Sequence, residues 1–178
     1  YDFIVKLDGD LSFDKYYFER CLNYFRHNTK LGIGGGDIYY CENKKKVREK
    51  NPLFHVRGAT KIYRKTCWED IGGVLKITGW DTLDEVKANM RGWATSTFFD
   101  IHVIQHRKTG SVAGIWSDLL KNGRANYISG YHPIFMFFKF IKRLTCKPYL
   151  IGAFIIYYGY IVNYIKKTSQ VSDKELIN

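Results

Sequence analysis

The chain has 178 residues, of which 46% are hydrophobic and 17% aromatic, and its formal net charge is +11. The apolar content is sufficient for one packed domain, and the basic balance favours a nucleic acid, an anionic membrane surface or a phosphorylated substrate as partner. The four cysteines lack CxxC or any other metal-binding spacing, which excludes a cysteine-based metal site and predicts reduced thiols in a cytosolic protein.

Residues 1–13, YDFIVKLDGDLSF, begin with alternating and β-branched apolar residues that predict a strand. Asp8 and Asp10, separated by Gly9, follow at its carboxyl end. Residues two apart point to the same side of a strand, so both carboxylates can face one ligand. An ordinary turn, for which Asp and Gly are typical residues, is the alternative. The first residues form no signal-peptide pattern. Because the sequence lacks an initiator Met and opens directly into a core strand, we expect it to be the later part of a longer protein.

Residues 12–28 have apolar side chains near helical spacing, which predicts a helix capped by Ser12 or Asp14. Residues 31–40, LGIGGGDIYY, predict a strand with close backbone packing, because their glycines match neither of the phosphate-loop spacings GxGxxG and GxxxxGK. The charge-rich residues 41–52 predict a mobile, solvated surface loop, with a lid over an anionic donor as the alternative.

Residues 54–73 predict a strand, a turn and a short helix that ends at Gly72 and Gly73. A further helix is predicted to have Asp81 or Thr82 as its N-cap and to end before Gly92, with one apolar face formed by Leu83, Val86 and Met90. Residues 94–111 alternate around apolar positions and predict a late strand that ends near His106 and Arg107.

From Tyr131 the composition changes to dense aromatic and aliphatic residues, with Lys and Arg at the breaks. The uncharged run 149–165 reaches the lower limit of about 17 residues for a membrane-spanning helix, although Gly152, Gly159 and several tyrosines weaken that interpretation. An amphipathic hairpin lying in the membrane interface is the alternative. Tyrosines at the lipid boundary and lysines near anionic headgroups suit either arrangement.

Four segments in this order, KLDGDLSF, VRGATKIYRKTCWEDIGGV, GWDTLDEVKANMRGW and VIQHRKTGS, resemble the inverting family-two glycosyltransferases of the GT-A fold. The resemblance covers residues 1–111 and places the DxD motif of that family at Asp8-Gly9-Asp10. It implies an α/β fold, with the carboxyl-terminal portion of a Rossmann-like, mixed-sheet GT-A domain over 1–130 and an apolar, membrane-associated helical tail over 131–178. The nucleotide-binding half of such a domain is expected to lie outside this sequence.

The resemblance implies metal-dependent transfer of a sugar from a nucleotide-sugar donor to a hydroxyl acceptor with inversion, in cell-surface polysaccharide or glycan synthesis. Carboxylates suit Mn²⁺ or Mg²⁺. We expect Asp10 to bind the metal directly, Asp8 to assist and His106 to complete the metal or diphosphate site; a structural role is the alternative for His106. The expected substrate-binding residues are Arg57, Gly58, Trp80 and Arg107, with Trp80 either stacking on a sugar ring or filling the core.

Asp81 is the expected general base for the acceptor hydroxyl, and the dipole of the helix that it begins would keep it ionised. N-capping of that helix is its alternative role. The family usually has a Glu-Asp pair where this chain has Trp80-Asp81, so Asp84, one helical turn later, is the alternative base.

The expected partners are a nucleotide-sugar donor, a glycan or lipid-linked acceptor and a membrane surface, and oligomer formation is compatible with the sequence. We expect a cytoplasmic protein that is peripheral on, or anchored to, the inner face of the cell membrane. A truncated, non-catalytic transferase acting as a binding module is the first alternative. A basic nucleic-acid-binding module is the second, but the chain has no helix-turn-helix, RNP-type or zinc-finger pattern, so no nucleic-acid partner is expected.

Overall fold

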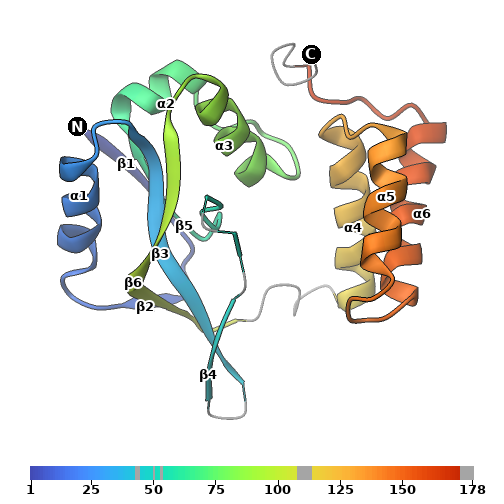
Figure 1. Ribbon diagram of the computed structural model, residues 1–178, viewed down its shortest axis with the longest axis horizontal. Helices are drawn as coiled ribbons and strands as arrows, with labels where there is room; N and C mark the ends of the chain where they lie inside the picture. The colour runs from blue at the N-terminus through green and yellow to red at the C-terminus, as the bar shows by residue number, and fades with distance from the viewer. Residues whose placement is uncertain (43–44, 50, 53, 108–113, 173–178) are drawn as a thin grey trace. The chain divides into compact units, whose positions relative to one another are not determined.

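The structure of the chain is a computed structural model that describes residues 1–42, 45–49, 51–52, 54–107 and 114–172. Internal contacts divide the chain into two compact units. The sheet unit comprises Tyr1–Leu75 and Asp81–Lys108, and the helical unit comprises Lys76–Trp80 and Thr109–Asn178 (Figure 1). The contacts therefore group residues 115–128 with the helical unit, whereas the change in composition had predicted that the tail begins at Tyr131.

A mixed sheet organises the sheet unit, with strand order β1-β5-β3-β6-β2 and with β4 paired to β3. Strand β3 runs parallel to β6, and the other strand pairs are antiparallel. The predicted α/β class is confirmed by this arrangement. The strands are β1 (Phe3–Leu7), β2 (Leu11–Phe13), β3 (Leu31–Glu42), β4 (Lys45–Arg48), β5 (Thr60–Arg64) and β6 (Ala94–Gln105).

Helices cover both faces of the sheet (Figure 1): α1 (Tyr17–His27) lies on one face, and α2 (Lys65–Ile71) and α3 (Trp80–Met90) lie on the other. Ile62 belongs to the hydrophobic cluster under α1, and Tyr63 belongs to the cluster under α2 and α3. Because adjacent residues of a strand point to opposite faces, the side chains of β5 contribute alternately to the two hydrophobic clusters.

The glycines of β3 confirm the predicted close packing. A Cβ atom on Gly35 would lie 2.0 Å from the carbonyl oxygen of Thr60, and one on Gly36 would lie 2.7 Å from that of Ile101. Any side chain at these positions would therefore push neighbouring strands apart.

The charge-rich residues 41–52 were predicted to form a mobile surface loop, and that prediction is wrong for residues 41–42 and 45–48, which lie in strands β3 and β4. Strand β4 pairs with β3, with Tyr39 opposite Arg48 and Cys41 opposite Lys46. The hydrogen bonds between β3 and β4 satisfy backbone groups of β4, while its lysine side chains extend into solvent, as is typical of an exposed edge strand. A strand of this kind has no apolar alternation from which it could be recognised.

The predicted helices are present, with three corrections. Helix α3 begins at Trp80, so Asp81 and Thr82 lie inside its first turn and neither is the predicted N-cap. Helix α1 begins after Tyr16 rather than after Ser12 or Asp14, although the Asp14 carboxylate accepts a hydrogen bond from the Tyr16 N–H at 2.8 Å. Helix α2 ends at Gly72 in the left-handed conformation, with φ of 71°, as predicted. The predicted inner face of α3 is wrong beyond Leu83, because Val86 and Met90 are exposed and the buried residues are Leu83, Asp84, Glu85 and Ala88.

The helical unit contains α4 (Ile115–Ile128), α5 (Pro133–Arg143) and α6 (Ile151–Ile165). Helix α4 was not predicted from the sequence. It packs closely on α6, because a Cβ atom on Gly123 would lie 2.2 Å from the carbonyl oxygen of Ile156. Helix α5 contacts α6 through Phe140, whose ring centroid lies 5.1 Å from that of Phe154. Within the described ranges, no helix combines the length and apolarity needed to cross a bilayer, and α6 has 15 residues.

Candidate functional site

The turn Asp8-Gly9-Asp10 lies between two other loop segments of the sheet unit. On one side, the backbone N–H of Asp8 donates to the carbonyl oxygen of Ala59 at 2.9 Å. On the other side, the backbone N–H of His106 donates to the carbonyl oxygen of Asp10 at 2.9 Å. The strand register causes both contacts, because β1 pairs with β5 and β2 pairs with β6 immediately beside the turn.

The two aspartates of this turn have different surroundings. The Asp8 carboxylate forms an ion pair with Lys6, two residues earlier on the same side of β1. The Asp10 carboxylate is half-buried and makes no ion pair with any residue that the structure describes. Asp10 is therefore the carboxylate of the turn that remains free to bind a cation.

In the part of the chain that the structure describes, no group of three or more His, Cys, Asp or Glu side chains could hold a metal ion. A complete protein cage is not required for Mg²⁺ or Mn²⁺, which proteins usually bind through one or two carboxylates together with substrate phosphates and water. The oxygen donors of Asp8 and Asp10 fit such a shared site. His106 is exposed and its Nε2 lies 2.6 Å from the Ser12 hydroxyl, so Ser12 orients the imidazole beside the turn, and the following Arg107 is exposed.

Asp81, in the first turn of α3, lies directly against Gly58. A Cβ atom built on Gly58 would be 2.9 Å from the Asp81 Cβ and 3.0 Å from its Oδ2. Since the neighbouring Ala59 receives the hydrogen bond from Asp8, residues 58 and 59 connect Asp81 to the aspartate turn. The structure thus brings together Asp8, Gly58 and Asp81, which come from three separate segments of the sequence.

Arg57 and Trp80 are the two remaining predicted substrate-binding residues. Arg57 forms an ion pair with Glu49, with 3.1 Å between Nε and Oε2. Its carbonyl oxygen accepts a hydrogen bond from the Thr60 N–H, which closes the turn that carries Gly58. Trp80 is half-buried, begins α3 and is grouped by its contacts with the helical unit.

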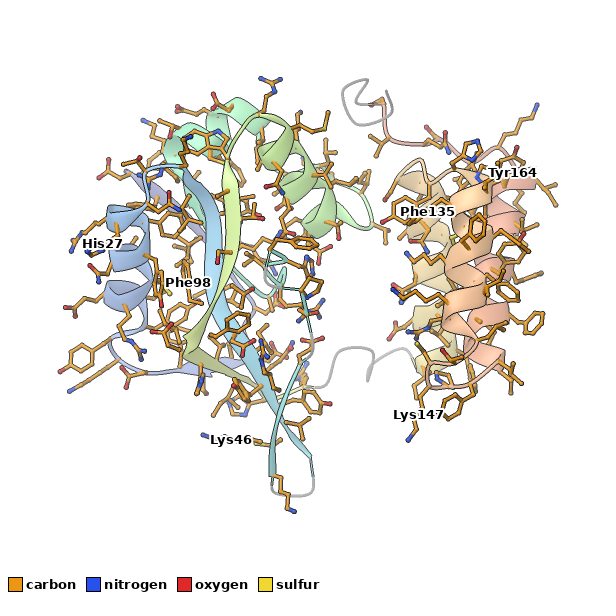
Figure 2. All side chains as sticks on the ribbon, viewed as in Figure 1. His27, Lys46, Phe98, Phe135, Lys147 and Tyr164 are labelled. Atoms are coloured by element: carbon orange, nitrogen blue, oxygen red, sulfur yellow. The ribbon has the colours of Figure 1, made fainter. Side chains whose placement is uncertain are left out.

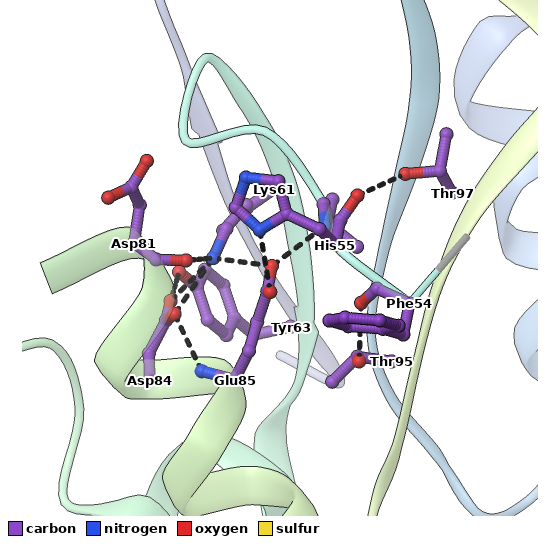
Figure 3. A network of polar contacts seen from close by, with 10 residues as sticks. Phe54, His55, Lys61, Tyr63, Asp81, Asp84, Glu85, Thr95 and Thr97 are labelled. Carbon is purple, nitrogen blue, oxygen red and sulfur yellow. Dashed lines mark hydrogen bonds and ion pairs between the residues drawn. The ribbon is translucent and has the colours of Figure 1, made fainter. Parts of the chain in front are cut away.

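A buried ionic network lies beneath Asp81 (Figure 3). The side chain of Lys61 is fully buried, and its Nζ lies 2.8 Å from Asp84 Oδ1 and 3.0 Å from Glu85 Oε1. Lys61 also donates a hydrogen bond to the backbone carbonyl of Asp81. The Tyr63 hydroxyl donates to Asp84, so the first turn of α3 is fastened to β5 by several strong contacts.

This network gives the two candidate bases, Asp81 and Asp84, different environments. The Asp84 side chain is 1% exposed and is surrounded by donors, and burial raises its pKa above the ordinary carboxyl value. The Asp81 carboxylate points away from the network (Figure 3), while its backbone carbonyl faces Lys61. Asp84 therefore has the environment of a structural anchor, and Asp81 has that of a group available to a substrate.

The same network holds the loop that precedes Gly58. Glu85 accepts a hydrogen bond from the Val56 N–H at 2.7 Å and lies 2.9 Å from His55 Nδ1. From the other side, Thr97 in β6 donates to the carbonyl oxygen of His55 at 2.7 Å. Helix α3 and strand β6 thus fix the path of this loop.

Sequence reasoning missed His55, Lys61, Tyr63 and Glu85. Two patterns could have drawn attention to them. Lys61 interrupts an otherwise buried strand, and the acidic pair Asp84-Glu85 follows one turn after the expected start of α3. Neither pattern identifies its partner, since the paired side chains are 21 or more positions apart.

No protein-family model matches the chain, and no curated protein matches it. Among solved structures, the chain is similar to the mannosyltransferase PcManGT from Pyrobaculum calidifontis, determined in complex with GDP-Man and Mn²⁺. The TM-score is 0.52 at 12% sequence identity, and the match covers 99% of this chain and 53% of that structure. The chain thus spans about half the length of this structural neighbour. It has a glycosyltransferase-like fold.

Proposed function

We propose that the protein is an inverting, metal-dependent glycosyltransferase of the GT-A type, which transfers a hexose-like sugar from a nucleotide-sugar to a hydroxyl acceptor. The observation that carries this proposal is the meeting of the Asp8-Gly9-Asp10 turn with Asp81 through Gly58 and Ala59. The glycosyltransferase-like fold, shared with a neighbour that holds GDP-Man and Mn²⁺, supports it.

The aspartate turn is assigned to the donor. Asp10, assisted by Asp8, would hold Mn²⁺ or Mg²⁺, and such a cation neutralises the charge that develops on a departing diphosphate. His106, oriented by the Ser12 hydroxyl, lies beside this turn and would complete the metal or diphosphate site. The exposed Arg107 adds a positive charge at the same end of β6.

Asp81 is assigned to the acceptor. The acceptor oxygen attacks the anomeric carbon from the face opposite the diphosphate, the bond from that carbon to the diphosphate breaks, and the hydroxyl proton passes to the Asp81 carboxylate. A base placed in this way contributes typically about 10²- to 10⁴-fold to the rate. Lys61 holds the backbone of Asp81 in place, and Trp80, at the start of α3, would provide an aromatic face for a sugar ring.

We further propose that the acceptor is a glycan or a lipid-linked saccharide, and that the enzyme works on the cytoplasmic face of the cell membrane in the synthesis of a cell-surface polysaccharide. The excess of positive charge supports an anionic surface or substrate, as does the composition of the helical unit.

A donor screen tests the proposal. The full-length protein is incubated with a panel of GDP- and UDP-sugars and Mn²⁺, and release of nucleoside diphosphate is measured with and without EDTA. We expect release from one donor class, its loss with EDTA, and its loss in Asp10→Ala without unfolding, because Asp10 lies in a turn rather than in a core. Asp2→Ala, an exposed acidic residue at the other end of β1, is the matched control and should leave release unchanged.

Two results would contradict the proposal. Wild-type turnover of Asp10→Ala, with no effect of EDTA, would remove the metal site. Donor binding without turnover under all conditions would identify the protein as a non-catalytic binding module.

A further inference from the structure

Large apolar side chains are exposed in a row along α5. Ile134, Phe137, Phe138 and Ile141 follow each other at helical spacing, so they lie on one face of the helix. Their exposed fractions are 62%, 48%, 63% and 46%, whereas Met136 on the opposite side is 1% exposed. Helix α5 thus turns one apolar side inward and a second one outward.

A groove with positive charge runs beside this apolar row. It has a volume of about 440 Å³ and is lined by Phe135, Phe138, Lys139, Lys142, Arg143 and Cys146. Phe138 belongs to both the row and the groove, so the two features are continuous. We call them together the α5 surface, and the side chain of Phe135 on it is labelled in Figure 2.

The positive charges of the α5 surface have no acidic partner in the part of the chain that the structure describes. The sequence contains no Asp or Glu between Asp118 and Asp173. Among the described residues, Lys142 and Arg143 form no ion pair, and the Arg143 Nε finds no hydrogen-bond acceptor. The Arg143 guanidinium makes one long hydrogen bond, of 3.4 Å, to the carbonyl oxygen of Lys147.

Lys139 adds to this unbalanced charge. Its ammonium group donates to Asn126 Oδ1 at 2.9 Å, which is a neutral partner. Burial lowers the pKa of Lys139, and the nearby Arg143 lowers it further. An anion in the groove would relieve the repulsion between these cations.

We propose that the α5 surface docks on an anionic phospholipid bilayer, with the apolar row in the boundary between headgroups and acyl chains and with Lys142 and Arg143 on a headgroup phosphate in the groove. An aromatic and aliphatic face bordered by Lys and Arg is the pattern of helices that lie in this interface. A bilayer offers a hydrocarbon layer directly beside negative phosphates, and it therefore complements both parts of the surface. This inference rests on the membrane location in the proposed function, which it assigns to the α5 surface, and it does not depend on sugar transfer.

Co-sedimentation with vesicles tests the inference without any donor or acceptor. The full-length protein is mixed with vesicles of phosphatidylcholine alone, or of phosphatidylcholine with an equal amount of phosphatidylglycerol. We expect binding to the anionic vesicles that weakens with added salt, and little binding to the neutral ones. Each basic residue at the membrane contributes about fivefold to the binding constant, so Lys142→Gln should bind about fivefold more weakly and Lys142→Gln with Arg143→Gln about 25-fold more weakly.

Matched controls remove the same groups elsewhere. Lys46→Gln removes an exposed charge from β4 (Figure 2) and should change binding by less than about twofold, because Lys46 is not on the α5 surface. Phe138→Asn removes an apolar group that enters the lipid and should weaken binding about tenfold or more. Met90→Gln, at an exposed position of α3, should leave binding unchanged.

Several outcomes would overturn the inference. The protein could remain in the supernatant at low salt, or bind neutral and anionic vesicles equally. A dimer that exists without vesicles and dissociates in Phe138→Asn would identify the α5 surface as a contact between copies of the chain. Unfolding of Phe138→Asn, followed by circular dichroism, would show that the apolar row is part of a core.

Discussion

The sheet unit and the helical unit treat positive charge in opposite ways. In the sheet unit, Lys61 is fully buried and lies within 3.0 Å of the carboxylates of both Asp84 and Glu85. In the helical unit, Lys142 and Arg143 border exposed phenylalanines and meet no carboxylate in the described ranges. A buried charge without a partner is costly, so its pairing is a condition of folding. Unpaired cations beside an exposed apolar face instead indicate a partner outside the chain.

Substitution of Lys61 gives the strongest test of this contrast. Lys61→Met leaves two buried carboxylates without their cation, and we expect a loss of about 3–5 kcal/mol in the free energy of unfolding. Lys142→Met, at an exposed position, should change it by no more than about 0.5 kcal/mol. Urea denaturation measures both, and equal effects would show that the two lysines do not differ as described.

The two units also use close glycine contacts for different purposes, and Gly58→Ala tests the contact at the site. The added methyl group would lie 2.9 Å from the Asp81 Cβ and must displace it. Because a displacement of about 1 Å can cost 10²-fold in rate, we expect transfer to fall about 100-fold while the protein stays folded. Retention of wild-type kcat would mean that the position of Asp81 is not critical.

Gly123→Ala tests the contact inside the helical unit. The new methyl group would lie 2.2 Å from the carbonyl oxygen of Ile156, so α4 and α6 must separate. We expect the free energy of unfolding to fall by about 1–3 kcal/mol. Gly9→Ala is the control for stability, because a Cβ atom there meets nothing within 4 Å. A thermal unfolding scan distinguishes the two, and equal stability would contradict the described helix contact.

Features of the fold that depend on local sequence were predicted, and features that depend on long-range contacts were not. Strand β1, helix α1 and the end of α2 at Gly72 were predicted, because periodicity and a left-handed glycine are local signals. The inner face of α3 was not, since Asp84 and Glu85 become buried only when Lys61 from β5 reaches them.

The candidate site divides similarly. Asp8, Asp10 and Asp81 were named from the residues and a family resemblance, but the contacts that join them cross from residue 8 to 59 and from 58 to 81. Strand β4 was missed because its lysine-rich sequence is typical of a loop, and its strand conformation depends on hydrogen bonds to β3.

The smallest expected effect concerns pH. Burial raises the pKa of Asp84 above its ordinary value of 3.8, against the opposing effects of Lys61 and Tyr63. The folded state therefore keeps this proton to higher pH than the unfolded chain does. Its contribution to stability is fully present below pH 3.8 and is lost as the pH rises through the folded pKa.

We accordingly expect the free energy of unfolding of the wild type to decline as the pH rises above 3.8, and this part of the decline to be absent in Asp84→Asn. Asp100 is a control of opposite sign, because a hydrogen bond from the Tyr24 hydroxyl lowers the pKa of its carboxyl group. The contribution of Asp100 is present above pH 3.8 and is lost as the pH falls through its folded pKa. Urea titrations of both variants across this range provide the measurement.

Asp81, held over the buried network, is proposed to accept the proton of the acceptor. The most direct test compares the transfer rates of Asp81→Asn and Asp84→Asn in the full-length protein, with donor binding measured separately by calorimetry. We expect Asp81→Asn to bind donor and metal normally but to lose transfer by about 10²- to 10⁴-fold, because only proton acceptance is removed. Folded Asp84→Asn should lose much less. Wild-type turnover in Asp81→Asn, or the reverse ranking of the two variants, would contradict the assignment.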